Sequence, residues 1–163
     1  MATHALANEL ARGLQSTGRR IVVAESCTGG LIASTLTNIA GSSSWFEGGY
    51  VTYTLYAKSA MLGISASTLQ HHGAVSQPVA EMMASNALAR SSADYGVAVT
   101  GLAGPDGDGS GTPVGTIWVG LARKCPHWIG TRRYHFTGSR KVIRNAAAAV
   151  CIEKLLELCG DNA

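Results

Sequence analysis

The sequence predicts a single α/β domain over residues 1–163, a three-layer α/β/α arrangement with a mixed sheet between its helices. Short apolar runs typical of buried strands alternate along the chain with segments whose apolar residues recur at helical spacing. The length of 163 residues suits one domain with a sizeable core, and a charged fraction of only 14% excludes a disordered chain. The longest apolar stretches fall short of the roughly 18 residues that a membrane span needs, so no membrane partner is expected.

The first third of the chain has a helix, strand, helix pattern. Leucines at every fourth position predict an amphipathic helix over about residues 3–17. The apolar run 20–25 predicts a buried strand, and helical spacing resumes over 32–39 after a turn of small residues. Residues 49–56 are mostly β-branched and aromatic, which predicts a second strand.

Helices are predicted for the middle of the chain. Short helices over 57–62 and 67–71 are each followed by a glycine stop signal. Ser76 then has the properties of an N-cap, with Pro78 in the first turn, where its missing N–H costs little. One face of this third helix is expected to be buried, with its methionines as core filler: Val79, Met82, Met83, Asn86 and Ala87.

The last third returns to strands and ends in a helix. Strands are predicted over 95–100, 114–122 and 130–136, and a helix over 139–158. The glycine-rich segment 101–115 is a loop, and a loop of this length in a compact domain is usually functional or mobile. The final helix is expected to bury the face formed by Val142, Ala146, Ala149 and Val150.

Basic residues cluster between positions 123 and 144, although the net charge of +3 is too small for a nucleic-acid footprint over the whole protein. Such a stretch predicts a local patch that attracts a phosphate. The alternative is an exposed strand and helix start that happen to be basic. The seven basic residues are Arg123, Lys124, Arg132, Arg133, Arg140, Lys141 and Arg144.

Cysteines and histidines give no sign of a metal site. The four cysteines form no C-x-x-C pair, and the five histidines show no ligand spacing, so neither a metal nor a cofactor is expected. Free thiols in a reducing compartment are the expected state, which predicts a cytoplasmic protein.

Two predicted strands end in residues that could carry chemistry, at the edge where α/β sheets bind ligands. One is followed by the turn from Ser26 to Gly30, and the other ends at Thr100. A serine at a strand-to-helix turn exposes its hydroxyl, and the amides of Thr28, Gly29 and Gly30 could hold an oxyanion or a phosphate. The turn is therefore a nucleophile elbow or anion cradle, or else a helix cap in which Ser26 or Thr28 satisfies free amides.

The spacing around Ser26 fits no standard nucleophile or phosphate-loop motif. His71 or His72 could complete a Ser-His-Asp triad, but nothing in the spacing selects either. Cys27 is a competing nucleophile, although in a tight turn its thiol points away from the serine hydroxyl and into the core. Lys58 is the remaining candidate base, since a desolvated lysine can deprotonate a serine; the alternative is a solvated lysine at a helix start.

Eight short segments point to a known family. They are AESCTGG at 24–30, AGSS at 40–43, FxGG at 46–49, VTY at 51–53, AK at 57–58, HGAVS at 72–76, TGLAGP at 100–105 and PVGT at 113–116. In this order they closely resemble the CinA carboxy-terminal domain family, the nicotinamide-nucleotide amidohydrolases. The likeness to the stand-alone form of that domain runs from about residue 6 to residue 158, and it implies one CinA carboxy-terminal-like domain.

This resemblance implies hydrolysis of the carboxamide of nicotinamide mononucleotide, without a metal, to nicotinate mononucleotide and ammonia in pyridine-nucleotide salvage. Ser26 resembles the family's nucleophile, which forms an acyl-enzyme, and Lys58 resembles its general base. Tyr53 resembles the third member, which supports the proton transfers. The positions that match substrate-holding residues of the family are Ser43, Thr100 and Arg140, with Arg140 at the phosphate.

Two segments depart from the family pattern. The family commonly has Ser-Asn-Glu between its tyrosine and Ala-Lys, whereas this chain has Thr54, Leu55 and Tyr56. It commonly has Gly-Asp-Arg where residues 138–140 of this chain are Gly-Ser-Arg. The loss of two polar residues beside the base could alter its pKa or its hydrogen bonds.

Two other functions remain open beside the amidohydrolase, which the sequence favours. One is a domain that binds and senses a nucleotide without hydrolysing it, as the departure at Leu55 and Tyr56 suggests. The other is a nucleic-acid partner, because aromatic residues are interleaved with the basic stretch, but this partner is not expected. An apolar surface of low charge favours a homo-oligomer.

Overall fold

The computed structural model describes residues 2–160 of the chain. Its elements in chain order are α1 (Ala2–Thr17), β1 (Ile21–Glu25), α2 (Leu31–Thr37), the 3₁₀ turn η1 (Ser42–Ser44), β2 (Phe46–Val51), α3 (Leu55–Leu62), α4 (Ala66–His72), α5 (Gln77–Ala89), β3 (Tyr95–Gly101), β4 (Thr116–Arg123), β5 (Trp128–His135) and α6 (Arg140–Gly160). None of the helices within these described residues combines the length and the apolar character needed to cross a membrane.

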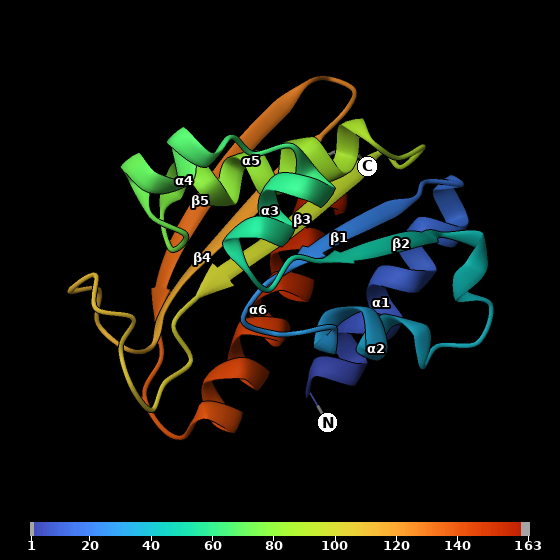
Figure 1. The fold of residues 1–163 in the computed structure, drawn as a ribbon. Coiled ribbons are helices and arrows are strands. Elements are labelled where there is room, and N and C mark those ends of the chain that lie inside the picture. The colour runs from blue at the N-terminus through green and yellow to red at the C-terminus, as the bar shows by residue number, and fades with distance from the viewer. Residues whose placement is uncertain (1, 161–163) are drawn as a thin grey trace.

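The strands form one mixed sheet in the order β2-β1-β3-β4-β5 (Figure 1). β1 pairs in parallel with β2 and β3, whereas β4 pairs antiparallel with β3 and β5. β1 and β3 are buried along nearly their whole length, which explains why they read as short apolar runs. The predicted mixed sheet is confirmed.

Helices cover both faces of this sheet (Figure 1). α1, α2 and α6 pack on one face, around a core that includes Leu10 and Ile152. α3, α4 and α5 pack on the other face, where Leu62 and Met83 are buried. The chain therefore has the predicted three-layer α/β/α architecture, and Met83 fills the core as expected.

Parallel pairing brings the carboxyl ends of β1, β2 and β3 to one edge of the sheet. Glu25, the last residue of β1, lies opposite Val51 of β2 and Val99 of β3. The amide of Ser26 continues the pairing by donating to Val99 O at 3.0 Å. The amide of Thr52 likewise donates to Glu25 O at 2.8 Å. Segments far apart in sequence therefore meet around Ser26.

The second strand lies earlier in the chain than predicted. β2 covers Phe46–Val51, and residues 54–56, which were predicted to belong to the strand, form the N-cap and start of α3. Thr54 Oγ1 accepts a hydrogen bond from the amide of Ala57 at 3.0 Å and so caps the helix. Propensity predicted a strand for this run, and the helix cap overrides that preference.

Helix α5 begins at Gln77, directly after Ser76, as predicted. The hydroxyl of Ser76 donates to Gly73 O at 2.9 Å instead of capping the helix. Met82 and Asn86, expected on the buried face, are only partly buried, and the buried side chains are Val79, Ala80, Met83, Ala84, Ala87 and Leu88.

Helix α6 buries a different face from the predicted one. Val142 is 52% exposed, and Ala146 and Ala149 are only partly buried, so of the four predicted residues only Val150 is in the core. Four consecutive alanines over 146–149 carry little periodic information, and spacing alone could not fix the face. The buried side chains are Ile143, Ala147, Ala148, Val150, Cys151, Ile152, Leu155 and Leu158.

Candidate active site

A serine and a lysine meet in the interior at the carboxyl edge of the parallel strands. Lys58 Nζ donates to Ser26 Oγ and to Thr52 O, both at 2.8 Å. Ser26 is 8% exposed and Lys58 is 1% exposed. None of the salt bridges among the described residues involves Lys58. The lysine ammonium therefore has only a hydroxyl and a carbonyl to replace its hydration.

Local structure places both side chains. Ser26 directly follows β1 and opens the turn toward α2. Lys58 lies one turn into α3, where its amide donates to Thr54 O at 3.0 Å. Lys58 and Leu62 are four residues apart and form the buried face of α3, as helical spacing requires.

Burial lowers the pKa of Lys58 from its ordinary 10.5 to about 8, because apolar surroundings disfavour the ammonium form. A lysine with such a pKa is neutral in a fraction of the molecules near physiological pH and can then accept a proton. Ser26 Oγ, which carries the proton to be removed, lies 2.8 Å from Lys58 Nζ. The pair is therefore suited to generate an activated serine nucleophile.

Ser26 and Lys58 line a pocket of about 460 Å³. This volume is in the range of small-molecule sites, which is about 300–1,000 Å³. Leucine side chains give part of the pocket an apolar lining, and Asp108 of the glycine-rich loop also lines it. The lining residues are Ser26, Tyr53, Thr54, Leu55, Lys58, Leu69, Gly73, Ala74, Val75, Thr100, Gly101, Leu102 and Asp108.

The amides at the start of α2 do not form the predicted anion cradle, because the side chain of Glu25 fills it. Glu25 is fully buried, at 0% exposure. Its carboxylate accepts hydrogen bonds from the amides of Gly30, Ile32 and Ala33 at 2.9, 3.1 and 2.8 Å.

The remaining amides of the turn differ in their partners. The amide of Gly29 donates to Ser26 O at 3.0 Å. Within residues 2–160, the amide of Thr28 has no acceptor in the protein. Neither Ser26 nor Thr28 caps α2, so the alternative of a serine or threonine cap is also wrong. Of the three amides predicted to bind substrate, only that of Thr28 has no acceptor within residues 2–160, although Thr28 is 0% exposed and does not line the pocket.

Arg144 of α6 holds the carbonyl side of this turn. Its Nε donates to Cys27 O at 3.0 Å, and its Nη2 donates to Thr28 O at 2.7 Å. Gly29 has a φ of +60°, and a Cβ there would lie 3.4 Å from Arg144 Nη2 and 3.8 Å from the ring of Tyr53. Glycine at this position therefore permits both the backbone conformation and the close approach of the guanidinium.

Tyr53 lies at the pocket and is held by Arg140. Arg140 donates from Nη2 to Tyr53 Oη at 2.6 Å and from Nη1 to Gly104 O at 2.7 Å. Because a guanidinium only donates, the hydroxyl hydrogen of Tyr53 remains available for another acceptor. The structure brings Ser26, Lys58 and Tyr53 to one pocket, with Arg140 in contact with one of its walls.

Thr100 lines the same pocket at the end of β3. It is 1% exposed, and its hydroxyl donates to Ala74 O at 2.7 Å. Its oxygen can still accept a hydrogen bond, because a hydroxyl carries two lone pairs.

Ser43 does not reach the pocket. It lies in η1, before β2, at the amino end of the parallel strands, whereas Ser26 lies at their carboxyl end. Its carbonyl accepts a hydrogen bond from Arg20 Nη1 at 3.3 Å. A residue that precedes a parallel strand is separated from the ligand edge by the length of that strand. Ser43 therefore does not line the pocket that contains Ser26.

Cys27 faces the core, as expected. It is 6% exposed, and burial raises the pKa of its thiol to about 11. A thiol of this kind is protonated near neutral pH, and the protonated form is a poor nucleophile.

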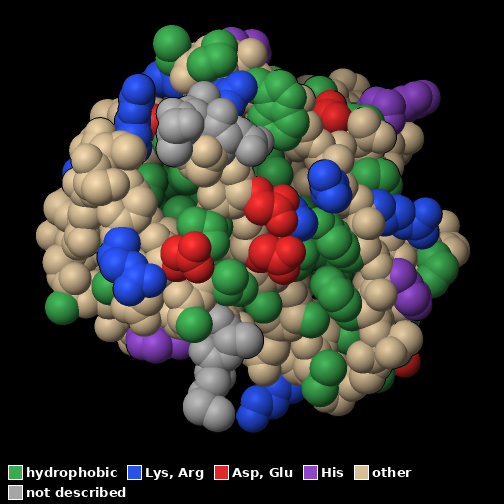
Figure 2. Space-filling model, turned by 180° about the vertical axis from the view of Figure 1, so that it is seen from behind, with side chains coloured by type: hydrophobic (Ala, Val, Ile, Leu, Met, Phe, Trp, Pro, Cys, Tyr) green, Lys and Arg blue, Asp and Glu red, His purple; other side chains and the backbone are tan. Residues whose placement is uncertain are grey.

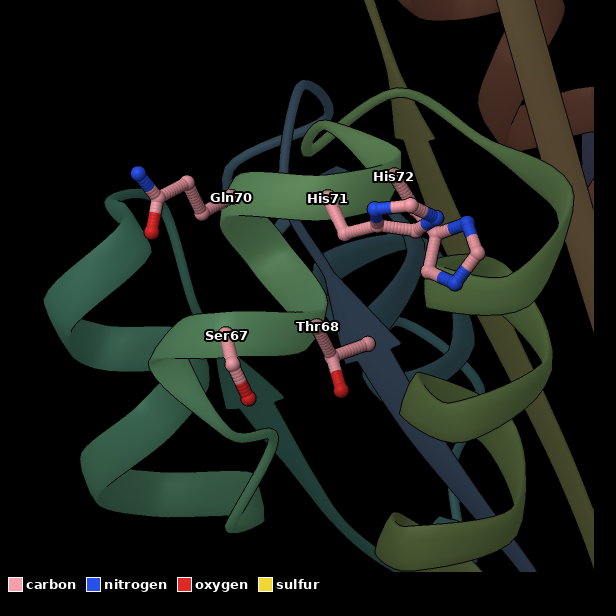
Figure 3. Close-up of a pocket in the computed structure, with 5 residues that line it drawn as sticks. All are labelled: Ser67, Thr68, Gln70, His71 and His72. Carbon is pink, nitrogen blue, oxygen red and sulfur yellow. The ribbon is translucent and has the colours of Figure 1, made fainter.

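His71 and His72 lie away from Ser26. Figure 3 shows them on α4, where they line a separate hollow of about 730 Å³ together with Ser67, Thr68 and Gln70. Neither histidine lines the pocket that contains Ser26, so the Ser-His-Asp alternative is not formed. In the described part of the chain, no three His, Cys, Asp or Glu side chains are grouped as metal ligands.

The basic stretch does not form the predicted single patch. Arg123 and Lys124 lie where β4 ends, beside the amino end of β3 and so at the opposite edge of the sheet from the pocket. Arg140 and Arg144 lie beside the pocket and the turn. Figure 2 shows Lys and Arg side chains dispersed over one face of the molecule. The pocket therefore has two neighbouring arginines from this stretch.

Sequence reasoning missed Glu25 as a site residue, and it named Arg144 only as part of the basic stretch expected to attract a phosphate. The signal for Glu25 is a carboxylate at the end of an apolar strand, since a buried carboxylate requires hydrogen-bond donors. The signal for Arg144 is its spacing of four residues from Arg140, which places both on one side of α6.

Comparison with known proteins agrees with this architecture. The family model described as CinA C-terminal domain matches residues 3–159. Nicotinamide-nucleotide amidohydrolase PncC of Escherichia coli (strain K12) is 45% identical over 150 residues, 92% of this chain and 90% of its own length. The protein of the same name from Pseudomonas putida is 42% identical over 153 residues, 94% of each chain.

Solved structures show the same fold. The crystal structure of competence/damage inducible protein CihA from Agrobacterium tumefaciens has a TM-score of 0.93 and 40% identity, and the match covers 97% of this chain and 96% of that one. A CinA superfamily protein from Klebsiella pneumoniae has a TM-score of 0.92 and 35% identity, and the match covers 98% of both chains. The chain belongs to the CinA C-terminal domain family.

Proposed function

We propose that the chain is a nicotinamide-nucleotide amidohydrolase, which hydrolyses the carboxamide of nicotinamide mononucleotide to nicotinate mononucleotide and ammonia. The observation that carries this proposal is the hydrogen bond of 2.8 Å between Lys58 Nζ and Ser26 Oγ in a buried setting. Relatives at 42–45% identity over more than nine tenths of the chain bear the name of this activity. Hydrolysis of an amide through a serine ester is the chemistry that such a pair supports.

The first half-reaction forms an acyl-enzyme. Neutral Lys58 takes the proton of Ser26 while Oγ bonds to the carboxamide carbon, and the carbonyl electron pair moves onto its oxygen. The ammonium of Lys58 then returns this proton to the substrate nitrogen. The electron pair on the oxygen re-forms the carbonyl as the C–N bond breaks, ammonia leaves, and the nicotinoyl group of the nucleotide stays on Ser26 as an ester.

The second half-reaction releases the product. A water molecule attacks the ester carbon and gives a proton to Lys58, and the bond between that carbon and Ser26 Oγ then breaks. Ser26 recovers its proton from Lys58, and nicotinate mononucleotide leaves. Tyr53 supports these transfers through its hydroxyl hydrogen, which the contact with Arg140 leaves available.

Arg140 and Thr100 are the residues proposed to hold the nucleotide. Arg140 uses Nη1 and Nη2 on Gly104 and Tyr53, and the guanidinium has further N–H groups that can donate to a phosphate. Thr100 offers the lone pairs of its hydroxyl from the pocket wall. Recognition of the 5′-phosphate would then depend on Arg140 instead of on the whole basic stretch.

The side chains of the departing segment 54–56 make no hydrogen bond to the base, Lys58. Thr54 caps α3, and Tyr56 is 81% exposed and absent from the pocket lining. Leu55 lines the pocket, but the hydrogen bonds of Lys58 go to Ser26 and Thr52. This arrangement favours an enzyme over a domain that only senses the nucleotide.

A cytoplasmic location and a homo-oligomeric state belong to the same proposal. The four cysteines are free, which agrees with a reducing compartment. Large apolar side chains are exposed around α3, and such side chains commonly lie at protein interfaces: Val51, Tyr53, Leu55, Tyr56 and Met61. Light scattering of the purified chain measures the oligomeric state directly.

Ammonia release tests the proposed function. Nicotinamide mononucleotide, nicotinamide riboside and nicotinamide are compared as substrates, and the mononucleotide is expected to be the best. Arg140→Ala should raise KM for the mononucleotide by about 10- to 100-fold, because hydrogen bonds to charged groups contribute about 1.5–3 kcal/mol. Lys141→Ala, which removes a neighbouring exposed charge, is the control and should leave KM unchanged.

Two outcomes would contradict the proposal. If the riboside is as good a substrate as the mononucleotide, Arg140 does not recognise a phosphate. If the chain binds the mononucleotide but releases no ammonia from it, the protein is a nucleotide sensor.

A further inference from the structure

The guanidinium of Arg144 donates hydrogen bonds to the backbone that follows Ser26. Its two hydrogen bonds, at 3.0 and 2.7 Å, go to the carbonyls of Cys27 and Thr28. Both contacts are partly buried, and they join residues more than a hundred positions apart in sequence. A planar fork of donors is suited to hold two successive carbonyls in fixed positions.

The amide side of the same turn is held in other ways, except at Cys27 and Thr28, whose amides donate to no other backbone group among residues 2–160. Ser26 O accepts the amide of Gly29 at 3.0 Å, which closes a four-residue turn. The carboxylate of Glu25 takes the amide of Gly30 at 2.9 Å. The amide of Thr28 is left without an acceptor among residues 2–160, although Thr28 itself is 0% exposed.

The direction of this amide follows from the peptide group that it shares with the Cys27 carbonyl. In a trans peptide group the N–H and C=O point in opposite directions, so the amide of Thr28 points away from the carbonyl of Cys27 and from Arg144. The hydroxyl of Ser26 is bonded to Lys58, and the amide of Thr28 donates to no protein group among residues 2–160.

We infer that Arg144 is a positioning residue of the acyl-transfer step, which fixes and polarises the Thr28 amide as an oxyanion donor. The carbonyl of Cys27 and the amide of Thr28 belong to one peptide group. A positively charged donor on that carbonyl therefore strengthens the amide as a hydrogen-bond donor. The oxyanion that forms when Ser26 attacks a carboxamide accepts this hydrogen bond. The inference rests on the proposed function, since it needs Ser26 to act as a nucleophile.

This role differs from recognition of the substrate phosphate, which the basic stretch first suggested for this region. Arg144 directs Nε and Nη2 onto protein carbonyls. A side chain that binds the substrate phosphate stabilises the ground state and the transition state equally, so loss of that side chain would raise KM. An oxyanion donor acts mainly in the transition state, so its loss lowers kcat.

Steady-state kinetics of Arg144→Ala with nicotinamide mononucleotide separate these roles. Loss of one oxyanion donor costs about 100- to 1,000-fold in kcat, and weakening one through Arg144 should cost at least about tenfold. KM should stay within about threefold of its original value. Guanidinium chloride at millimolar concentration should restore part of kcat, whereas equal ammonium chloride should not, because only guanidinium has the planar fork. Lys141→Ala is the control from the same helical turn and should keep kcat.

Labelling of Ser26 by a fluorophosphonate provides a readout that does not need the natural substrate. This reagent also places a developing negative oxygen beside the nucleophile, so Arg144→Ala should slow labelling and guanidinium should restore it. If the chain is labelled at Ser26 but releases no ammonia, the proposed function is wrong. The labelling rate of Arg144→Ala then still tests whether Arg144 supports the oxyanion donor.

Three results would overturn the inference. They are an unchanged kcat in Arg144→Ala, a rise in KM alone, and a loss of kcat that guanidinium does not restore. If the unaltered chain neither labels at Ser26 nor releases ammonia, Ser26 is not a nucleophile and the inference is wrong.

Discussion

Lys58 is a buried cation whose hydrogen bonds go to uncharged groups, Ser26 Oγ and Thr52 O. Removing an ammonium from water costs free energy when no carboxylate compensates. Buried charged groups without a charged partner are therefore candidates for functional residues. The sequence identified Lys58 as a possible base but could not separate it from a solvated lysine. The reason is physical, because burial of Lys58 depends on tertiary packing, and its partner Ser26 is 32 residues away in the chain.

Lys58→Arg is expected to lower kcat/KM nearly as far as Lys58→Ala, by at least about 100-fold, because a guanidinium keeps the charge but cannot act as a base. In the unaltered chain kcat/KM should rise with pH through an ionisation near the Lys58 pKa of about 8, since only the neutral amine accepts a proton. Ammonia release measured from about pH 6 to pH 9.5 gives this profile. An active Lys58→Arg chain with the same profile would mean that the lysine only positions substrate.

At the scale of elements, the β1–turn–α2 unit was predicted correctly, but the group that fills the helix N-terminus was not. Local sequence patterns are enough to predict a strand and a helix. The group that accepts hydrogen bonds from the first amides of α2 depends instead on the path of the chain in the turn before the helix. Here the last residue of the strand, Glu25, takes that place. The boundary between β2 and α3 was misplaced for a related reason, since the Thr54 cap outweighs the strand propensity of its neighbours.

Glu25→Gln is expected to destabilise the fold by at least about 2 kcal/mol, because three hydrogen bonds lose their charged acceptor and an amide NH₂ group faces backbone donors. Denaturant unfolding measures the change. Glu47→Gln is the matched control, since this carboxylate forms a partly exposed ion pair with Arg20 and its loss should destabilise the fold much less. Equal losses in the two variants would mean that the Glu25 carboxylate is not what holds the turn.

For the whole molecule, the order of the parallel strands determines which residues share the site. Ser26, Tyr53 and Thr100 follow or end neighbouring strands, and their convergence could be anticipated from the fold class. Ser43 precedes its strand and therefore lies at the other edge, which a matching motif does not reveal. Arg140 and Arg144 reach the site from α6, and only the tertiary structure shows this.

The free energy of unfolding of the whole chain should depend on pH through the ionisation of Lys58. Its folded pKa of about 8 is below the ordinary 10.5, so the unfolded chain binds more protons between these values and stability rises with pH across that window. Lys58→Met lacks this contribution. The free energy of unfolding of the unaltered chain, minus that of Lys58→Met, should therefore increase by on the order of 3 kcal/mol from pH 8 to above pH 10.5. A difference that stays constant with pH would show that the pKa of Lys58 is ordinary.

Ammonia release from saturating nicotinamide mononucleotide by Ser26→Ala and Cys27→Ala, measured beside the unaltered chain, tests most directly whether Ser26 is the nucleophile. Ser26→Ala should lose turnover, because no other hydroxyl bonds to Lys58 Nζ in residues 2–160. Cys27→Ala should keep most of it, since the Cys27 thiol is buried and its pKa is raised to about 11. Undiminished turnover by Ser26→Ala, or its loss in a folded Cys27→Ala chain, would contradict a serine acyl-enzyme.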